Sequence, residues 1–205
     1  MVKREDKKEL ITRQRQQQIL EAALGVFSKH GFDRATIPDI AREAGIAVGT
    51  IYNYYESKRE LLVAIANKYV MEPFAEIIKH GNTEDDTAFI TKIMENRLNF
   101  GLENIGTFLP MFNEVQKDDE LRQAFSENVL GPVMNVIENF IRTRTKDGAF
   151  RKTNTHLSTR AVAGMIIGFL ILSRFEGEDS PVHTTDRRRL AAELADLIYN
   201  GLRKP

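Results

Sequence analysis

Apolar residues recur three or four positions apart along nearly the whole chain, which is the spacing of one face of an α-helix. No stretch alternates apolar and polar residues over the length of a strand. We therefore predict an all-α fold of about nine helices. Gly31 should end the first helix in a left-handed conformation. The later helices are predicted at 37–44, 48–54, 57–78, 85–105, 107–116, 118–145, 154–176 and 184–202.

Two prolines and the first residues of the chain add detail to this pattern. Pro73 lies inside the fourth predicted helix and Gly131–Pro132 inside the seventh, so each should kink its helix. Residues 1–60 hold a slight excess of basic over acidic side chains, and most phenylalanines follow residue 60. We predict two domains, 1–60 and 61–205.

Composition excludes several classes of protein. The chain has 205 residues with 29 basic and 29 acidic side chains, so its formal net charge is zero. It contains no cysteine, which excludes disulfides, thiol catalysis and cysteine–zinc sites and fits a reducing compartment. The longest apolar run, Ala161–Leu172, is too short for a membrane span of about 20 residues. We expect a soluble, cytoplasmic protein that does not act at a membrane.

The second and third predicted helices are short and are joined at Gly45, which indicates a helix-turn-helix. On the third helix, Ile51 and Tyr55 share one face with Val48 beside them, and this group should pack inward on Ile40 and Ala41. The opposite face carries Gly49, Thr50 and Asn53, and threonine and asparagine can hydrogen-bond base edges in a major groove. This arrangement predicts a helix that reads DNA sequence.

Other side chains near this helix could contact DNA phosphates. The hydroxyls of Tyr52 and Tyr54 flank the outward face, and Thr36 should cap the second helix. Ser57 and Glu60 have the spacing of a capping box, so the fourth helix should start there. Lys58 lies at this helix start, where the helix dipole already favours an anion. A mobile arm, Lys3–Arg15, should supply part of the phosphate neutralisation.

Three segments resemble the N-terminal domain of the tetracycline-repressor (TetR/AcrR) family: FSKHGF at 27–32, TIPDIAREAGI at 36–46 and GTIYNYYESKRELL at 49–62. The resemblance implies a homodimeric bacterial transcriptional regulator, most often a repressor of a palindromic operator. A small ligand in the C-terminal domain would release it from DNA. By resemblance, the DNA contacts are Thr36, Val48, Gly49, Thr50, Tyr52, Asn53, Tyr54 and Lys58.

Two residues depart from the family pattern. Ala47 occupies the position where the family usually has a serine or threonine that caps the recognition helix, a loss of about 1 kcal/mol. Tyr55 replaces the usual phenylalanine and adds a hydroxyl to the core.

The family usually dimerises through its last two helices. Two glycines four residues apart on the eighth helix favour a close contact there, because each costs about 1 kcal/mol in a helix interior. Packing within one chain is the alternative for the larger side chains. The predicted dimer interface consists of Ala161, Gly164, Gly168, Phe169, Leu172, Leu190, Leu194, Leu197 and Ile198.

A ligand cavity would lie among helices four to eight and, being mostly apolar, would suit a lipophilic small molecule. Ordinary core packing is the alternative for its apolar residues. Arg97 could bind an anionic ligand group, or it could be solvated or salt-bridged. The candidate ligand residues are Ile93, Arg97, Phe100, Met111, Phe112, Asn135, Ile137 and Met165.

The sequence offers no catalytic, metal or cofactor site. His156 and His183 lack a partner at metal-ligand spacing, and no phosphate-binding glycine loop occurs. An enzyme is therefore not expected. The alternative to a regulator is a helical small-molecule or protein-binding module that keeps the fold without specific DNA binding, which the balanced charge and Ala47 favour.

Overall fold

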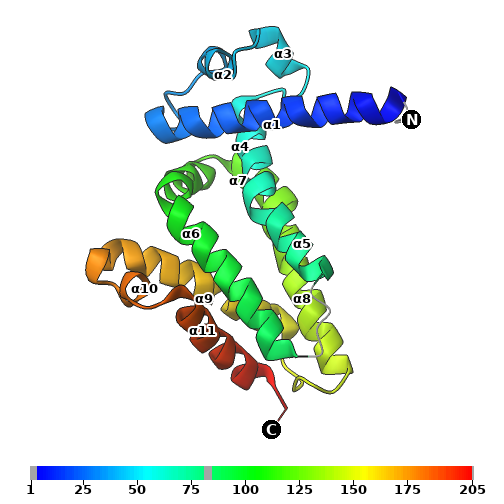
Figure 1. Ribbon diagram of the computed structural model, residues 1–205, viewed down its shortest axis with the longest axis vertical. Helices are drawn as coiled ribbons and strands as arrows, with labels where there is room; N and C mark the ends of the chain where they lie inside the picture. Colours follow the sequence, from blue (N-terminus) through cyan, green and yellow to red (C-terminus); the bar gives the residue numbers. More distant parts are fainter. Residues whose placement is uncertain (1–3, 81–84, 205) are drawn as a thin grey trace. The chain divides into compact units, whose positions relative to one another are not determined.

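The structure is a computed structural model that describes residues 4–80 and 85–204. These residues form helices and no strand, which confirms the all-α prediction (Figure 1). The α-helices are α1 Arg4–His30, α2 Ile37–Ala44, α3 Val48–Tyr52, α4 Lys58–Ala66, α5 Glu72–His80, α6 Asp86–Lys117, α7 Asp119–Phe125, α8 Gly131–Lys146, α9 Thr155–Glu176, α10 Pro181–Thr184 and α11 Arg187–Leu202.

Two π-helical turns interrupt the helices next to the prolines at which kinks were predicted. Asn67–Met71 joins α4 to α5 just before Pro73, and Ser126–Leu130 joins α7 to α8 just before Pro132. Proline has no N–H for the carbonyl four residues earlier, and its ring clashes with that carbonyl, so the helix widens there. Counting each joined pair once, the described residues form nine helices, as predicted.

The chain divides into two compact units that are not contiguous in sequence. The first combines the residues up to Tyr69 with Gly106–Val129, and the second combines Val70–Ile105 with the residues from Leu130 onward. The predicted domains, 1–60 and 61–205, are contiguous, and that division by function stays a prediction.

The first unit has a core built on α1. Ile19 and Ala23 of α1 are fully buried together with Ile40 of α2, Ile51 of α3 and Leu61 of α4. Gly31 and Gly45 end α1 and α2 with φ angles of 75° and 64°, a left-handed conformation that glycine adopts without strain. The helix ends predicted from these glycines are confirmed.

The second unit has its own core, to which α6, α8 and α11 contribute Leu98, Ile141 and Leu194. A Cβ atom placed on Gly101 of α6 would lie 2.3 Å from the side chain of Leu170 in α9. Glycine at position 101 therefore leaves room for the side chain of Leu170, which would have to move if residue 101 carried a Cβ.

Three predicted boundaries were wrong. Segments 85–105 and 107–116 are one helix, α6. Gly106 and Pro110 lower the intrinsic stability of this helix, but tertiary packing of both its ends keeps it continuous. Helix α3 ends at Tyr52 rather than residue 54. The predicted mobile arm is helical from Arg4 onward, while Lys3 lies outside the described residues.

One helical stretch, Thr155–Asp179, is long and apolar enough by length and composition to cross a membrane, and most of it is exposed. The sequence prediction of no membrane span used only the uninterrupted apolar run Ala161–Leu172, which is shorter than this helical stretch. Such a helix needs a cover over its exposed face, whatever that cover is.

Candidate nucleic-acid interface and effector unit

The two faces of α3 divide as the sequence predicted. Ile51 and Tyr55 are buried in the first unit, whereas Gly49 and Asn53 are exposed and Thr50 is half-buried. No atom outside the local backbone lies within 4 Å of the position where a Cβ on Gly49 would be. The outward face of α3 is therefore open to the close approach of another molecule.

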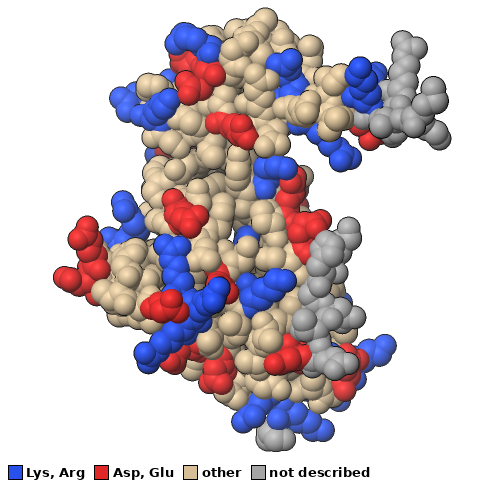
Figure 2. All heavy atoms as spheres, in the orientation of Figure 1, with Lys and Arg blue, Asp and Glu red and all other residues tan. Residues whose placement is uncertain are grey.

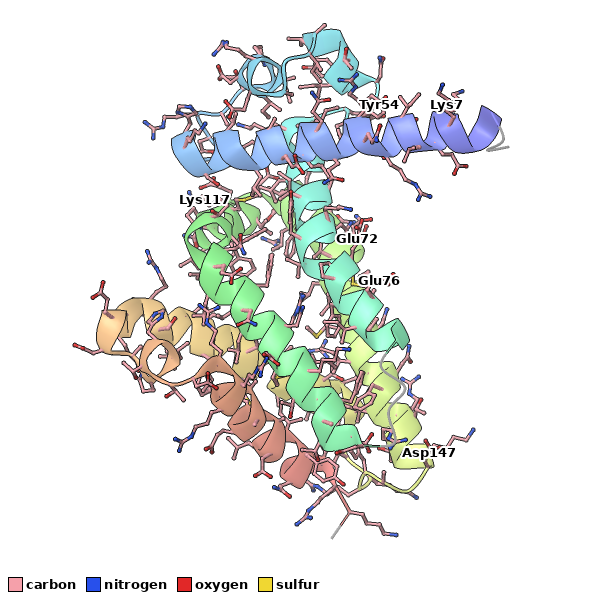
Figure 3. All side chains as sticks on the ribbon, viewed as in Figure 1. Lys7, Tyr54, Glu72, Glu76, Lys117 and Asp147 are labelled. Carbon is pink, nitrogen blue, oxygen red and sulfur yellow. The ribbon has the colours of Figure 1, made fainter. Side chains whose placement is uncertain are left out.

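The three remaining residues assigned to this surface are partly or largely exposed. Tyr52 is 53% exposed. Val48 was predicted to pack inward beside Ile51, but it is the first residue of α3 and is 38% exposed, so that part of the prediction was wrong. Tyr54 is half-buried against the core of the first unit, so only part of its ring is available (Figure 3).

Thr36 caps α2, as predicted. Its hydroxyl oxygen accepts a hydrogen bond from the backbone N–H of Asp39 at 3.3 Å, and its hydroxyl donates to the Asp39 carboxylate at 2.5 Å. The second bond lowers the pKa of the Asp39 carboxyl. The only hydroxyl proton of Thr36 is thus already engaged within the chain.

Lys58 has partners that its predicted role as a phosphate contact did not include. Its ammonium group donates to the backbone carbonyls of Phe32 at 2.6 Å, Asp33 at 3.1 Å and Ala35 at 3.1 Å. It also lies 4.4 Å from the centre of the Phe32 ring. All three ammonium protons therefore bond the loop that leads into α2.

Ser57 caps the helix that begins at Lys58, as predicted, by accepting a hydrogen bond from the backbone N–H of Glu60 at 3.1 Å. The carboxylate of Glu60 accepts a hydrogen bond from the N–H of Glu56 at 2.6 Å, one residue before the partner that a capping box would use. These two bonds fix the start of α4 directly after the recognition segment.

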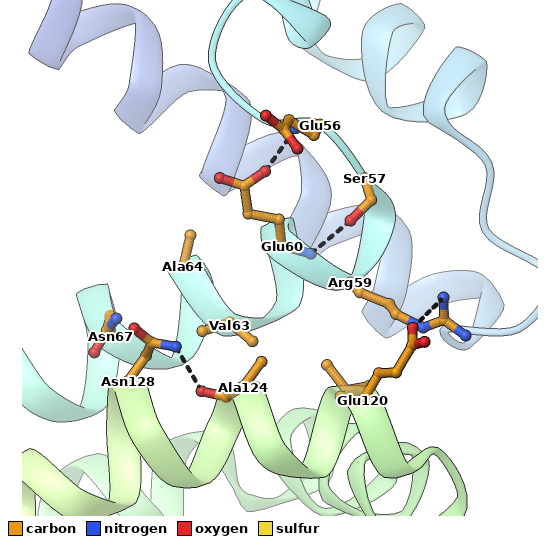
Figure 4. A pocket seen from close by; sticks show the side chains of 11 residues that line it. Glu56, Ser57, Arg59, Glu60, Val63, Ala64, Asn67, Glu120, Ala124 and Asn128 are labelled. Carbon is orange, nitrogen blue, oxygen red and sulfur yellow. Dashed lines mark hydrogen bonds and ion pairs between the residues drawn. The ribbon is translucent and has the colours of Figure 1, made fainter.

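An open groove of about 670 Å³ lies between α4 and α7 within the first unit (Figure 4). Arg59 at its rim pairs with Asp118 at 2.5 Å and with Glu120 at 3.7 Å. Asp118 also caps α7 by accepting from the N–H of Leu121 at 3.0 Å, and these bonds lower the pKa of its carboxyl. The sequence did not predict this groove, because Arg59 and Asp118 are far apart along the chain.

The N-terminal part of α1 extends beyond α3 in Figure 1 and carries several basic side chains (Figure 2, upper right). Lys7, Lys8 and Arg13 are exposed there, together with the apolar Leu10 and Ile11. Ile19 is the first residue of α1 in the core of the first unit, so the segment before it packs against little of that core.

The eight candidate ligand residues do not all lie in one unit. Met111 is buried in the core of the first unit, and Phe112, in the same unit, is exposed with its ring edge on Phe125. Asn135 of α8 is exposed on the second unit. These three positions correct the prediction. Met111 and Phe112 belong to the first unit because the sixth predicted helix is the end of α6, and Asn135 is excluded because it faces solvent. The five that remain together in the second unit are Ile93, Arg97, Phe100, Ile137 and Met165.

The predicted dimer face is divided by the structure. Leu190, Leu194 and Ile198 of α11 are buried in the core of their own unit, so they are not available to a partner. Spacing of four residues identifies a stripe but not the surface that covers it. The other predicted residues stay at least partly exposed: Ala161, Gly164, Gly168, Phe169, Leu172 and Leu197.

Helix α9 exposes more apolar surface than the sequence analysis named. Leu157, Ile167 and Phe175 are all at least half exposed, and Phe175 is 85% exposed. A Cβ on Gly164 or Gly168 would meet nothing within 4 Å. The face is therefore apolar, continuous along the helix and open to close approach by another backbone.

No group of three or more metal-ligating side chains occurs in the part of the chain that the structure describes. His156, which lacked a partner at ligand spacing in the sequence, lies 3.0 Å from the buried Glu138 carboxylate of α8. That pair joins the start of α9 to α8.

A short helix-turn-helix with a polar, exposed second helix, carried by an all-α chain, defines a DNA-binding transcriptional regulator. Residues 19–65 match the family model for bacterial regulatory proteins of the tetR family, and residues 101–200 match the C-terminal domain of AefR-like transcriptional repressors. The chain belongs to the tetR family of bacterial regulatory proteins.

Named relatives agree with this membership. The chain is 26% identical over 154 residues to the fatty acid metabolism regulator protein of Bacillus subtilis (strain 168), which covers 74% of this chain and 77% of the relative. It is 25% identical over 171 residues to the HTH-type transcriptional regulator BetI of Yersinia pestis (strain Pestoides F), covering 80% and 83%. These relatives place the chain among ligand-responsive transcriptional regulators.

A solved structure has the same fold. The transcriptional regulator FadR from Bacillus subtilis, in complex with stearoyl-CoA, aligns with a TM-score of 0.75 over 90% of this chain and 98% of its own. The two sequences are 19% identical in that alignment, so the likeness concerns the fold.

Proposed function

We propose that this regulator is a cytoplasmic repressor that binds a palindromic operator as a homodimer, with α3 of each copy in a major groove. The observation that carries the proposal is the outward presentation of Gly49, Thr50 and Asn53 while Ile51 and Tyr55 are buried. Threonine and asparagine can bond base edges, and the glycine lets the backbone approach them. The proposed DNA contacts are Thr36, Val48, Gly49, Thr50, Tyr52, Asn53 and Tyr54.

Lys58 is the eighth residue that the family resemblance assigned to DNA. Because its three protons bond carbonyls at 2.6–3.1 Å, we propose that it acts by holding the loop before Thr36 in place. The helical residues Arg4–Arg15 are proposed to supply phosphate neutralisation in place of a mobile arm.

We propose that the cover of α9 is a second copy of this chain. A two-fold dimer would bring two such faces together, and the open space at Gly164 and Gly168 would let the helices approach closely. The exposed Leu197 of α11 would join the same interface. This occupant accounts for the apolar length of Thr155–Asp179 without a membrane.

We propose that the effector is a small lipophilic molecule that binds in the second unit. Two relatives support a fatty-acyl compound: one is named for fatty acid metabolism, and the structure of FadR holds stearoyl-CoA. No catalytic role is proposed, and the named relatives are transcriptional regulators.

The proposal is tested by footprinting the purified protein on the DNA upstream of its own gene, with fluorescence anisotropy to measure affinity. We expect a protected palindrome, and Asn53→Ala should weaken binding by about 10- to 100-fold, since a base contact is worth 1–3 kcal/mol. Asn135→Ala is the matched control, because Asn135 is also an exposed asparagine but lies on α8.

The opposite result would support the second candidate, a helical binding module without specific DNA recognition. That outcome is a protein with no protected site at low salt and equal affinity for any DNA sequence. The absent serine or threonine cap at Ala47, which has no side-chain hydrogen bond to α3, is the observation that favours this alternative.

A further inference from the structure

Arg97 of α6 is a largely buried cation with no ion pair among the described residues. Its guanidinium donates to the backbone carbonyl of Val70 at 2.9 Å and to the side-chain oxygen of the neighbouring Asn96, also at 2.9 Å. Two aromatic rings lie near it, with centres 5.8 Å away for Phe74 and 5.5 Å for Phe100. All of these partners are neutral.

Burial shifts the pKa of the Arg97 guanidinium. Removal from water lowers the pKa of Arg97 to about 10, and no charged side chain in the part of the chain that the structure describes offsets the shift. The side chain is therefore still protonated at neutral pH. The second unit holds a positive charge whose hydration has largely been lost.

Three other arginines of the same unit are paired with carboxylates. Arg144 pairs with the buried Asp86 at 2.7 Å, and Arg187 and Arg188 pair with glutamates of α6. Arg187 and Arg188 are also much more exposed to water than Arg97. Among these arginines, the most deeply buried charge is the one without a carboxylate.

A buried charge is costly to a fold unless an anion pairs with it. Aromatic faces and carbonyls return only part of the lost hydration free energy. A methionine could fill the same volume without that cost. The charge is therefore explained if an anion from outside the chain completes the site.

The surroundings define the rest of such a ligand. Ile93, Met94 and Leu98, which precede or follow Arg97 within one helical turn, are buried, and so is Phe74, whose ring centre lies 5.8 Å from the guanidinium carbon. A ligand that reaches the guanidinium would be surrounded by apolar side chains next to its charged group. That environment suits an amphiphile with one anionic head and a hydrocarbon body.

We propose that Arg97 binds the anionic head, a carboxylate or a phosphate, of an amphiphilic effector in the second unit. The inference rests on the proposed function, which places the effector in that unit. It adds the anionic head group of the effector and the residue that selects it. Carboxylate and phosphate each offer oxygens that accept hydrogen bonds from a guanidinium. Nε and Nη2 of Arg97 already donate to the Asn96 oxygen and Nη1 to the Val70 carbonyl, so the remaining N–H groups of Nη1 and Nη2 would donate to the anion.

The test is isothermal titration calorimetry of the full-length protein with three probes of equal chain length: dodecanoate, dodecyl phosphate and the neutral dodecanol, each below its aggregation limit. The wild-type protein should bind at least one anionic probe about 10- to 100-fold more tightly than dodecanol, the range for a hydrogen-bonded charged group. Comparison of the two anions identifies the head group.

Arg97→Gln keeps a hydrogen-bond donor for the Val70 carbonyl but removes the charge. It should bring the anionic probes down to the affinity of dodecanol while leaving dodecanol binding unchanged. Arg187→Gln, at an exposed arginine of α11, is the matched control and should keep the preference. A role confined to bonding Val70 would leave the preference for anions intact in Arg97→Gln, and that result would overturn the proposal.

The remaining outcomes separate this inference from the proposed function. If dodecanol releases the protein from its operator as well as the anions do, the regulator stands and the role of Arg97 is refuted. Should none of the three probes bind, the role of Arg97 is refuted as well. If the anions bind through Arg97 but no operator is protected, the proposed function fails while the anion site stands.

Discussion

The exposed faces of α3 and α9 differ in what they need to become functional. The face of α3 is polar and short, and the segment around it is held by local bonds such as the Thr36 cap and the left-handed Gly45. The face of α9 is apolar over many turns, with Leu172 and Phe175 exposed and two glycines that meet nothing. The polar side chains on α3 are stable in water without a partner, whereas the apolar face of α9 needs another molecule to cover it.

This difference shows where a local reading of the chain is sufficient. A polar helix face in water is stable by itself, so its geometry follows from spacing and capping. An exposed apolar face and a buried unpaired charge are both unfavourable alone, so each indicates something that binds. The four changes below test this contrast.

The largest effect is expected from Leu172→Glu. It would place two carboxylates in the proposed contact between α9 helices, which should convert the dimer to monomer and lower operator affinity by roughly 1000-fold, since one half-site remains. Light scattering after size exclusion measures the oligomeric state. Leu130→Glu is the matched control, because Leu130 is also an exposed leucine, at 42%, but lies outside α9 and outside the proposed DNA contacts. A variant that stays dimeric would show that α9 is covered by something else.

A second change contrasts two ion pairs of similar chemistry. The Asp86–Arg144 pair of the second unit has a carboxylate that is only 8% exposed, and Asp86→Asn should lower the free energy of unfolding by about 3 kcal/mol. The Lys29–Glu43 pair of the first unit is exposed on both sides, and Glu43→Gln should cost less than about 1 kcal/mol. Urea unfolding measures both. Equal losses would mean that burial does not distinguish the pairs.

Lys58→Met tests whether the start of α4 is held from within the chain. Loss of three bonds to carbonyls should lower the free energy of unfolding by about 2 kcal/mol, the range for bonds to charged groups. The dependence of operator binding on salt should stay nearly the same. If the slope of log affinity against log salt concentration fell by about one while stability stayed unchanged, Lys58 would instead be a phosphate contact.

The sequence predicted most of what depends on neighbours within a few positions. The all-α class, the caps at Thr36 and Ser57, the turns at Gly31 and Gly45 and the buried side of α3 all follow from spacing of three or four residues. Such features involve bonds across one helical turn, so no knowledge of distant segments is needed.

The sequence could not predict features that depend on distant segments. Lys58 has the right charge and place for a phosphate, but the carbonyls it bonds lie 23 to 26 residues earlier. A helical wheel groups Leu194 with Leu197, yet the first is buried by its own unit and the second is exposed. Arg97 was recognised as polar among apolar residues, but the absence of a carboxylate partner is visible only in three dimensions.

The smallest expected effect comes from Ala47→Ser at the start of α3. Ala47 has the extended backbone of a capping residue, with φ −70° and ψ 144°, but has no side-chain bond to the helix. A serine there should raise the free energy of unfolding by about 1 kcal/mol. Ala192→Ser, at an exposed position inside α11, should instead lower it by about 0.5 kcal/mol, since serine is a poorer helix former than alanine. Opposite signs in urea unfolding would show that a local cap still stabilises α3 in addition to the packing of Ile51, and equal signs would show that this packing already fixes the first turn.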